Sequence, residues 1–295
     1  MHKLITILGP TASGKSGLAI ELAKKYNGEV ISADSRQVYR GLDIGTGKVT
    51  AEEMDGVPHH LLDVVNPEDQ FTVVDFKKLA DKAIGDIVSR GKIPILAGGT
   101  GFYIDSVVKN IIPPEVPPNE ELRNALEEKS LEELNALLLE KDPARHSMID
   151  IHNKRRIIRA LEIIEDQGSV PPIESNPQYN VLQLGIQVDE EVLRKKIMDR
   201  LLSRIDDGMI EETRQLHEQG LSYERMDSLG LEYRFLAKLL KEEITHEEFV
   251  TLLHTAICQY AKRQRTYFRR DENIKWFGVS QTMEVEEVIT AFLKK

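Results

Sequence analysis

Residues 4–16 read LITILGPTASGKS, and this stretch decides the fold. The apolar run over 4–8 predicts a buried strand, and the loop that follows matches G-x4-G-K-S/T from Gly9 to Ser16. Its glycines let backbone N–H groups point into one concavity, next to the positive end of a helix dipole. A chance match in a turn is disfavoured because the motif lies between a predicted strand and a predicted helix. The stretch predicts a di- or triphosphate-binding loop, with Lys15 on the outer phosphates and Ser16 on Mg²⁺.

Strands and helices alternate through the first part of the chain. We expect a helix over 16–26 that ends at Gly28, a strand leading to Asp34, a possible strand over 59–65, an amphipathic helix over 75–91 and a buried strand over 92–99. This alternation predicts an α/β fold, a P-loop NTPase-like, doubly wound parallel sheet.

The chain changes character at residues 113–118, PPEVPP, and again at 168–180, which are rich in Pro, Ser and Asn. The segment between them is helical in pattern and highly charged. A strand over 181–189 and mostly helical patterns follow, including one over 190–220. We therefore predict a P-loop core (1–112), an inserted all-helical domain (113–180) and a second, mostly helical part of the core (181–295).

Composition bounds the function. With 39 Lys and Arg against 49 Asp and Glu, the net charge is −10, so a nucleic-acid partner would need local basic patches. Cys258 is the one cysteine; it excludes an internal disulfide and suits a small buried helix residue. The apolar N-terminal run is too short for a signal peptide, and no stretch approaches a membrane span. These features predict a cytoplasmic soluble protein without membrane contact, and nothing indicates an obligate partner chain, so we expect a monomer.

Asp34 follows a predicted buried strand in the stretch EVISADSRQVYRGLDIGTGK, residues 29–48. A carboxylate there could coordinate Mg²⁺, act as a general base, or cap the next helix. GTGK at 45–48 resembles a second phosphate loop but lacks its first glycine spacing and final Ser or Thr, so we interpret it as a turn.

The segment IPILAGGTGFY, residues 93–103, is where an NTPase would place a second Mg²⁺-binding acid. It ends instead in GGTG, and Asp63 is a fallback. GGTG is either a simple turn or a close approach to ligand with the Thr100 hydroxyl as donor; its place after a buried strand favours the second. The missing acid weakens an NTP-hydrolysis function.

Two basic clusters, KRRIIRALEII (154–164) and KRQRTYFRR (262–270), stand out in this acidic chain. Each could be a solvated helix face, but together they favour a polyanionic partner modestly. Arg194, Arg200 and Arg204 are expected to form surface ion pairs, although one could close over a diphosphate. His59 and His60 lack a third ligand, so turn or core histidines are favoured over a metal site.

The motifs GPTASGKS, SADSRQVYRGLDIGTGK, PHHLLDVVNP, ILAGGTGFY and AKRQRTYFRR occur in this order. Together they resemble the bacterial tRNA dimethylallyltransferase (tRNA isopentenyltransferase) family, from Leu4 to about Arg270. The resemblance implies transfer of a dimethylallyl group from its diphosphate to the exocyclic amine of the tRNA adenosine 3′-adjacent to the anticodon. It also implies a need for Mg²⁺ and a helical insertion that grips the anticodon stem.

The resemblance assigns roles residue by residue. Asp34 matches the acid that accepts the amine proton, and Thr100 the threonine that contacts the leaving diphosphate. The diphosphate-binding set comprises Thr11, Ala12, Ser13, Gly14, Lys15, Ser16 and Arg200, with Ser16 as metal ligand. The tRNA-contacting set comprises Ser35, Arg36, Gln37, Arg155, Arg156, Arg159, Lys262, Arg263, Gln264, Arg265 and Arg269. The chain departs from the family at Leu231, where a tyrosine commonly follows the glycine.

Two other functions compete with this one. An adenylate isopentenyltransferase or a P-loop small-molecule kinase would act on a free nucleotide, which needs neither an insertion nor basic clusters. A nucleotide-dependent RNA-binding protein would need a clearer second acid for Mg²⁺. The predicted insertion and basic clusters, and the lack of a clear second acid, therefore favour the tRNA enzyme.

Overall fold

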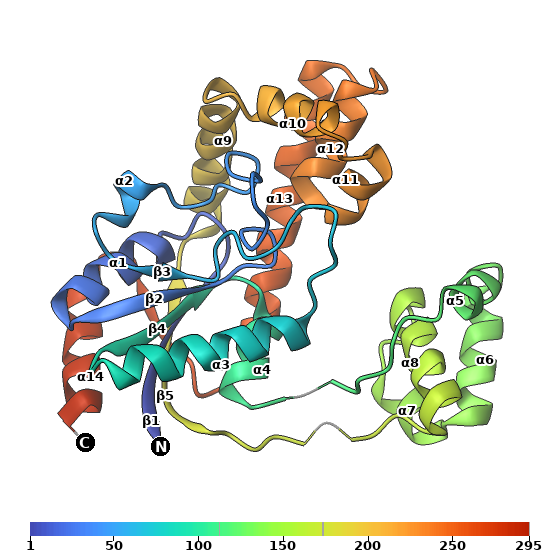
Figure 1. Cartoon of the computed structure of the whole chain (residues 1–295), viewed down its shortest axis with the longest axis horizontal. Helices are drawn as coiled ribbons and strands as arrows, with labels where there is room; N and C mark the ends of the chain where they lie inside the picture. The colour runs from blue at the N-terminus through green and yellow to red at the C-terminus, as the bar shows by residue number, and fades with distance from the viewer. Residues whose placement is uncertain (112, 173, 295) are drawn as a thin grey trace. The chain divides into compact units, whose positions relative to one another are not determined.

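The computed structural model of the chain describes residues 1–111, 113–172 and 174–294. These form two compact units (Figure 1). The first comprises residues 1–110 and 176–295, and the second comprises residues 111–175. Each unit has a hydrophobic core of its own.

A six-stranded sheet, parallel throughout, forms the centre of the first unit. Its strand order is β3-β2-β4-β1-β5-β6, which confirms the predicted doubly wound α/β fold. The strands are β1 (His2–Leu8), β2 (Gly28–Ala33), β3 (His59–His60), β4 (Ile93–Gly98), β5 (Tyr179–Gln187) and β6 (Lys275–Gly278). Tyr179 and Asn180, which we expected in the insertion, therefore belong to the sheet.

Side chains of β1 alternate between two cores because successive residues of a strand point to opposite faces. Ile5 and Ile7 pack with α1, while Leu4 and Leu8 pack with α3 and α4. The covering helices are α1 (Lys15–Lys25) and α14 (Thr282–Lys294) on one face, and α3 (Val73–Ser89) and α4 (Gly101–Val108) on the other. The short helix α2 (Ala51–Met54) begins at a Thr50 capping box.

The prediction that Gly28 ends the first helix was wrong. Asn27 takes the left-handed conformation, with φ of 51°, and Gly28 is the first residue of β2. A Cβ at Gly28 would lie 2.8 Å from the Ile93 carbonyl oxygen, so glycine is needed there for close strand packing. The strand expected over 59–65 was too long, since only His59–His60 pairs with β2 and the chain then turns, with positive φ at Leu61 and Asp63.

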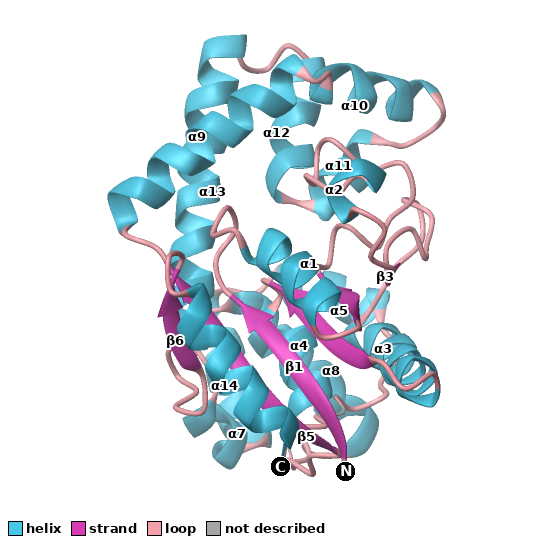
Figure 2. Ribbon diagram, turned by 90° about the vertical axis from the view of Figure 1, so that its left-hand side faces the viewer, coloured by secondary structure: helices cyan, strands magenta, loops and turns pink. Residues whose placement is uncertain are grey.

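Five helices stand beyond the carboxyl ends of the strands (Figures 1 and 2). They are α9 (Glu190–Asp206), α10 (Met209–Glu218), α11 (Tyr223–Leu229), α12 (Leu231–Leu240) and α13 (His246–Phe268). The helical pattern expected over 190–220 is interrupted at Gly208, whose φ of 101° breaks it into α9 and α10. These helices roof the sheet edge where ligands bind in doubly wound folds.

The second unit consists of helices in its described residues. They are α5 (Glu120–Glu127), α6 (Leu131–Lys141), α7 (Pro143–Met148) and α8 (Lys154–Gln167). Leu134, Leu138 and Ile157 are fully buried in its core. Buried Glu162 accepts a hydrogen bond from the Asn119 N–H and pairs with Arg123, which ties the start of α5 to α8.

Candidate functional site

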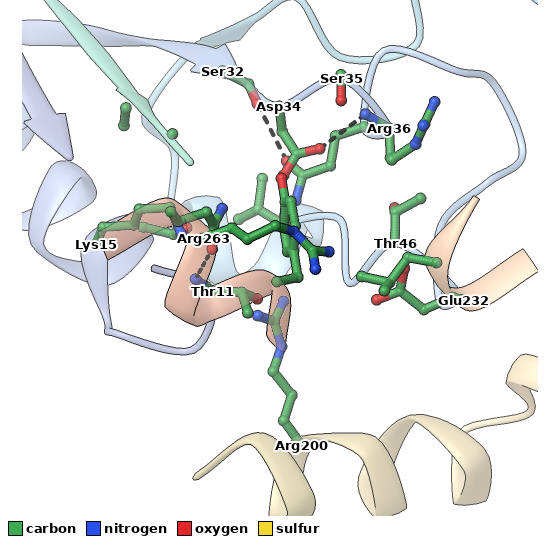
Figure 3. A pocket seen from close by; sticks show the side chains of 18 of the residues that line it. Thr11, Lys15, Ser32, Asp34, Ser35, Arg36, Thr46, Arg200, Glu232 and Arg263 are labelled. Carbon is green, nitrogen blue, oxygen red and sulfur yellow. Dashed lines mark hydrogen bonds between the residues drawn. The ribbon is translucent and has the colours of Figure 1, made fainter. Parts of the chain in front are cut away.

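The strand order brings three loops together at one edge of the sheet. β2, β4 and β1 are neighbours in the order β2-β4-β1, so the segments that follow their carboxyl ends meet. These segments carry Asp34, Thr100 and the P-loop (residues 9–16). The P-loop, the segment after β2 and the end of β4 at Ala97 and Gly98 border a cavity of about 520 Å³ that α9, α12 and α13 also line (Figure 3), whereas Thr100 lies just outside its lining. Lining residues named in the sequence prediction are Thr11, Lys15, Ser16, Asp34, Ser35, Arg36, Gln37, Arg200, Arg263 and Gln264.

The P-loop has the backbone of a phosphate cradle. Ala12 and Gly14 have φ of 60° and 91°, and α1 begins at Lys15. The first N–H groups of a helix lack intrahelical acceptors, so they can bind an anion. The Ser13 side chain, by contrast, is fully buried away from the cavity, and its hydroxyl has no partner among the described residues.

Lys15 is poised for an anionic ligand. Its Nζ donates to the Pro10 carbonyl oxygen at 3.1 Å. Burial lowers the pKa of Lys15 to about 8, Asp34 acts in the opposite direction, and the Arg200 charge lowers it further. An anion bound between Lys15 and Arg200 would offset both unfavourable effects.

Asp34 is held by the turn that follows β2. Its Oδ1 accepts the Arg36 backbone N–H at 2.9 Å. The alternative that Asp34 caps the next helix is wrong, because residues 35–49 form turns and a single bridge, with α2 beginning only at Ala51. Thr100 stands beside this turn: its Oγ1 accepts the Ser35 N–H at 3.1 Å and caps nothing in α4. The acid and the threonine are thus joined through one backbone segment.

Tyr260 on α13 lies in the same cavity, and the sequence prediction missed it. Its hydroxyl lies near the Thr100 side chain, which slightly lowers the pKa of the phenol. Burial, and secondarily the Asp34 charge, raise the pKa of Tyr260 to about 12, so the phenol keeps its proton at neutral pH. The Arg263 guanidinium lies over this ring, 5.8 Å from its centroid. The pattern TAICQYAKRQR carried no signal for this role beyond helical spacing to Arg263.

Gln264 bridges two of the three loops. Its side chain accepts the Thr11 N–H at 2.8 Å and donates to the Gly99 carbonyl oxygen at 2.9 Å. It is 6% exposed. Although Gln264 borders the cavity, both ends of its amide are engaged by protein groups, which places it as a clamp between the P-loop and the segment after β4.

Arg200 reaches from α9 toward the cavity (Figure 3), and its Nη2 donates to the Gly47 carbonyl oxygen at 2.8 Å. Gln37 donates to the same oxygen at 3.2 Å. Arg204 does not form the expected surface pair: it is buried, donates to the Gly45 carbonyl oxygen at 2.8 Å and lies 3.5 Å from Glu232. Arg204 is buried because residues 43–48 fold over this part of α9.

The fallback acid Asp63 is engaged elsewhere, in an ion pair with buried Lys48. His60 pairs with the buried Glu29, and burial lowers the pKa of His59, whose Nδ1 contacts the Val57 carbonyl oxygen. Among the described residues, no group of three or more His, Cys, Asp or Glu side chains could hold a metal ion.

The remaining basic residues lie outside this cavity. Lys262 and Arg269 are exposed on α13 and its end, and Arg265 pairs with Glu190 at 2.8 Å. In the second unit, Arg155 and Arg156 are exposed on α8, whereas Arg159 donates to the Val116 carbonyl oxygen at 2.8 Å. Cys258 is only partly buried, less than expected.

Leu231 lines the cavity from the start of α12. Its φ of 29° is unusual for a residue with a Cβ, and it follows Gly230, whose φ is 76°. The site therefore meets an apolar side chain at the position where the sequence departs from the family.

Comparison with known proteins agrees with this architecture. Residues 37–271 match the model of the IPP transferase family. The chain belongs to this family. It is 48% identical over 277 residues to tRNA dimethylallyltransferase 2 of Treponema denticola, covering 92% of this chain and 93% of that protein. It is 46% identical to tRNA dimethylallyltransferase 1 of Geotalea uraniireducens, covering 91% and 89%.

Solved structures of IPP transferases agree as well. The tRNA isopentenylpyrophosphate transferase of Bacillus halodurans aligns with a TM-score of 0.77 at 38% identity, covering 100% of this chain and 97% of that one. A eukaryotic dimethylallyltransferase acting on tRNA aligns with a TM-score of 0.86 at 26% identity, covering 100% and 80%. As a member of the IPP transferase family the protein is a prenyltransferase, and prenyltransferases that use diphosphates generally need a divalent metal. None of the described helices combines the length and apolar character needed to cross a membrane.

Proposed function

We propose that this IPP transferase moves a dimethylallyl group from dimethylallyl diphosphate to the exocyclic amine of the tRNA adenosine 3′-adjacent to the anticodon. One observation carries the proposal: Asp34 and Lys15 face the same cavity, close enough for the Asp34 charge to act on the pKa of Lys15. An acid and a phosphate-binding lysine in one cavity suit a reaction between a diphosphate and a weakly basic amine.

The chemistry follows from the charges. The C–O bond between the allylic carbon and the diphosphate breaks, the amine nitrogen forms a bond to that carbon, and the amine proton passes to Asp34. Lys15 and Arg200 stabilise the charge of the departing diphosphate, and Thr100 donates to it. The amine is a poor nucleophile because its lone pair is delocalised into the ring, so a carboxylate base contributes on the order of 10²–10⁴ in rate.

Mg²⁺ fits this site through Ser16 and the diphosphate oxygens. When bound, it would neutralise charge on the leaving group. Ser16 lines the cavity at the start of α1, one residue after Lys15, as the motif requires.

We assign the acceptor to tRNA because of the relatives' names and the exposed cations. The target adenine must leave its stack, at a cost of roughly a few kcal/mol. Arg155 and Arg156 on α8, Lys262 on α13 and Arg269 just after it are exposed and suited to phosphate contacts that offset this cost. Arg36 lies in the cavity itself, where it could contact the target nucleotide. We propose that the enzyme acts as a monomer.

A test is to incubate the purified protein with Mg²⁺, dimethylallyl diphosphate and unmodified tRNA, and to weigh the anticodon-loop fragment by mass spectrometry. We expect one added C5 unit on tRNA and none on free AMP tested in parallel. Modification of AMP alone would favour an adenylate isopentenyltransferase. ATP hydrolysis without prenylation would instead indicate a P-loop kinase or ATPase.

A further inference from the structure

A second glycine–lysine loop borders the site, and its concave side is already filled. We call residues 43–48, DIGTGK, the second loop. Three successive backbone N–H groups of this loop donate to the carboxylate of Glu212 on α10. The Asp43 and Ile44 N–H groups reach Oε2 at 3.1 and 2.6 Å, and the Gly45 N–H reaches Oε1 at 3.0 Å. Successive N–H groups that converge on one anion form a nest, the device that phosphate loops use for their ligands.

Tyr233 donates the fourth hydrogen bond to the Glu212 carboxylate. Its hydroxyl donates to Glu212 Oε1 at 3.0 Å, and its side chain is 1% exposed. Burial, and then the Glu212 charge, raise the pKa of Tyr233 well above its ordinary value, so it remains a donor. The ring also packs against Gly45, where an added Cβ would lie 2.6 Å from the hydroxyl oxygen. Glu212 is therefore fixed from both sides, by the second loop and by α12.

The far end of the second loop enters the active site. The Gly47 carbonyl oxygen accepts the Arg200 guanidinium at 2.8 Å and the Gln37 amide at 3.2 Å. Gly47 has φ of 59°, and a Cβ there would collide with the Arg200 guanidinium, so this backbone lies directly against the side chain that it orients. Residues 43–45 lie only two to four positions before this oxygen in the same loop.

We propose that Glu212 is a positioning residue for diphosphate binding: by filling the nest of the second loop, it fixes the Gly47 carbonyl oxygen and through it the guanidinium of Arg200. The inference rests on the proposed function for the identity of the diphosphate. Glu212 itself touches neither substrate, and it acts through the second loop. A carboxylate is required because it alone offers acceptors to four donors without carrying a donor of its own.

Binding measurements on the full-length protein test this. Calorimetric titration with dimethylallyl diphosphate and Mg²⁺, without RNA, compares Glu212→Gln with Glu211→Gln. The control changes the neighbouring carboxylate, which is exposed and pairs with Arg214 on the helix surface. In Glu212→Gln an amide NH₂ faces N–H donors, so we expect the dissociation constant to rise about tenfold or more. We expect Glu211→Gln to bind as the wild type does.

A double-mutant cycle separates positioning from general destabilisation. If Glu212 acts through Arg200, then Arg200→Ala with Glu212→Gln binds no more weakly than Arg200→Ala alone. Turnover should follow the same split, with KM for dimethylallyl diphosphate raised more than kcat is lowered. Unchanged affinity in Glu212→Gln, or additive losses in the double variant, would overturn the proposal.

Milder variants cover the case in which Glu212→Gln does not fold. Tyr233→Phe removes one of the four hydrogen bonds and should raise the dissociation constant about threefold. Gly45→Ala pushes on the Tyr233 hydroxyl and should act in the same direction. If both fold and bind as the wild type does, the inference fails.

Two outcomes separate this inference from the proposed function. If the wild-type protein binds diphosphate but prenylates no RNA, only the proposed function is refuted. If the wild-type protein prenylates tRNA and the variants bind diphosphate as the wild type does, only this inference is refuted.

Discussion

The P-loop and the second loop are alike in composition and opposite in use. Both present backbone N–H groups around a concavity, and both contain a Gly-Lys pair, at Gly14-Lys15 and Gly47-Lys48. The P-loop opens onto the cavity, where its lysine has a lowered pKa. In the second loop the nest holds the internal carboxylate of Glu212, and Lys48 is buried against Asp43, Asp63 and the Tyr39 carbonyl oxygen. The same local chemistry thus binds a ligand in one loop and holds structure in the other.

The largest expected effect concerns the acid beside the P-loop. Asp34→Asn keeps the size and the acceptor for the Arg36 N–H but removes the base, so turnover should fall by about 10²–10⁴. Binding of tRNA, measured by filter binding, should stay within a factor of about two, since no phosphate contact is lost. Loss of tRNA binding with turnover per bound complex unchanged would give Asp34 a structural role, like that of Glu212.

Exchanging each lysine for methionine should separate the two loops. Lys15→Met should weaken dimethylallyl diphosphate binding about 10- to 100-fold, because a charge-assisted hydrogen bond is lost. It should leave the free energy of unfolding unchanged or higher, since a partly buried charge is removed. Calorimetry and urea denaturation measure the two effects.

Lys48→Met should give the opposite pattern. Removing it leaves Asp43, Asp63 and the Tyr39 carbonyl oxygen without their shared donor, so we expect a loss of about 1–3 kcal/mol in unfolding free energy. Diphosphate affinity should change by less than in Lys15→Met. Equal affinity losses in the two variants would remove the distinction between the loops.

The pH dependence of binding tests the P-loop lysine alone. Its pKa of about 8 in the free enzyme means that Lys15 is charged below pH 8 and loses its proton above it. Affinity for dimethylallyl diphosphate should therefore fall as pH rises through about 8, and binding should take up a proton there. Calorimetry in buffers of different ionisation enthalpy measures this uptake, which should vanish in Lys15→Met and persist in Lys48→Met.

The smallest effects are expected at the two left-handed glycines. Gly14→Ala and Gly47→Ala should each cost about 1–2 kcal/mol of backbone strain. At Gly14 a Cβ meets nothing within 4 Å, whereas at Gly47 it collides with Arg200. Beyond the common loss of stability in thermal unfolding, only Gly47→Ala should displace the Arg200 guanidinium, and its effect on diphosphate affinity should be absent in an Arg200→Ala background.

The sequence predicted those parts of the site that depend on short, contiguous motifs. The P-loop lies between a strand and a helix, and Asp34 and Thr100 each follow a buried strand. That they converge is a property of the strand order β2-β4-β1, which the doubly wound pattern makes plausible. Gly28 illustrates a limit: α1 ends at Lys25, Asn27 takes the left-handed conformation, and Gly28 is needed instead for its close approach to Ile93 in the sheet.

Other parts of the site depend on pairings far apart in the chain. Tyr260 and Gln264 are ordinary helix residues in sequence, and only the docking of α13 against the loops gives them partners. Glu212 likewise belongs to an acidic helix start in which Glu211 looks equivalent. One of the two turns inward to the second loop and the other stays at the surface, a choice that depends on how α10 packs.

Gln264 has a consequence for the synthesis of the chain. Its side chain joins Thr11 in the P-loop to Gly99, and Gln264 lies 253 positions after Thr11 in the sequence. A ribosome would finish the whole phosphate-loop motif long before α13 emerges from the exit tunnel. During that interval the nascent chain carries the motif without the clamp that holds its loop against β4. Diphosphate binding should therefore arise late in translation, as a property of the nearly finished polypeptide.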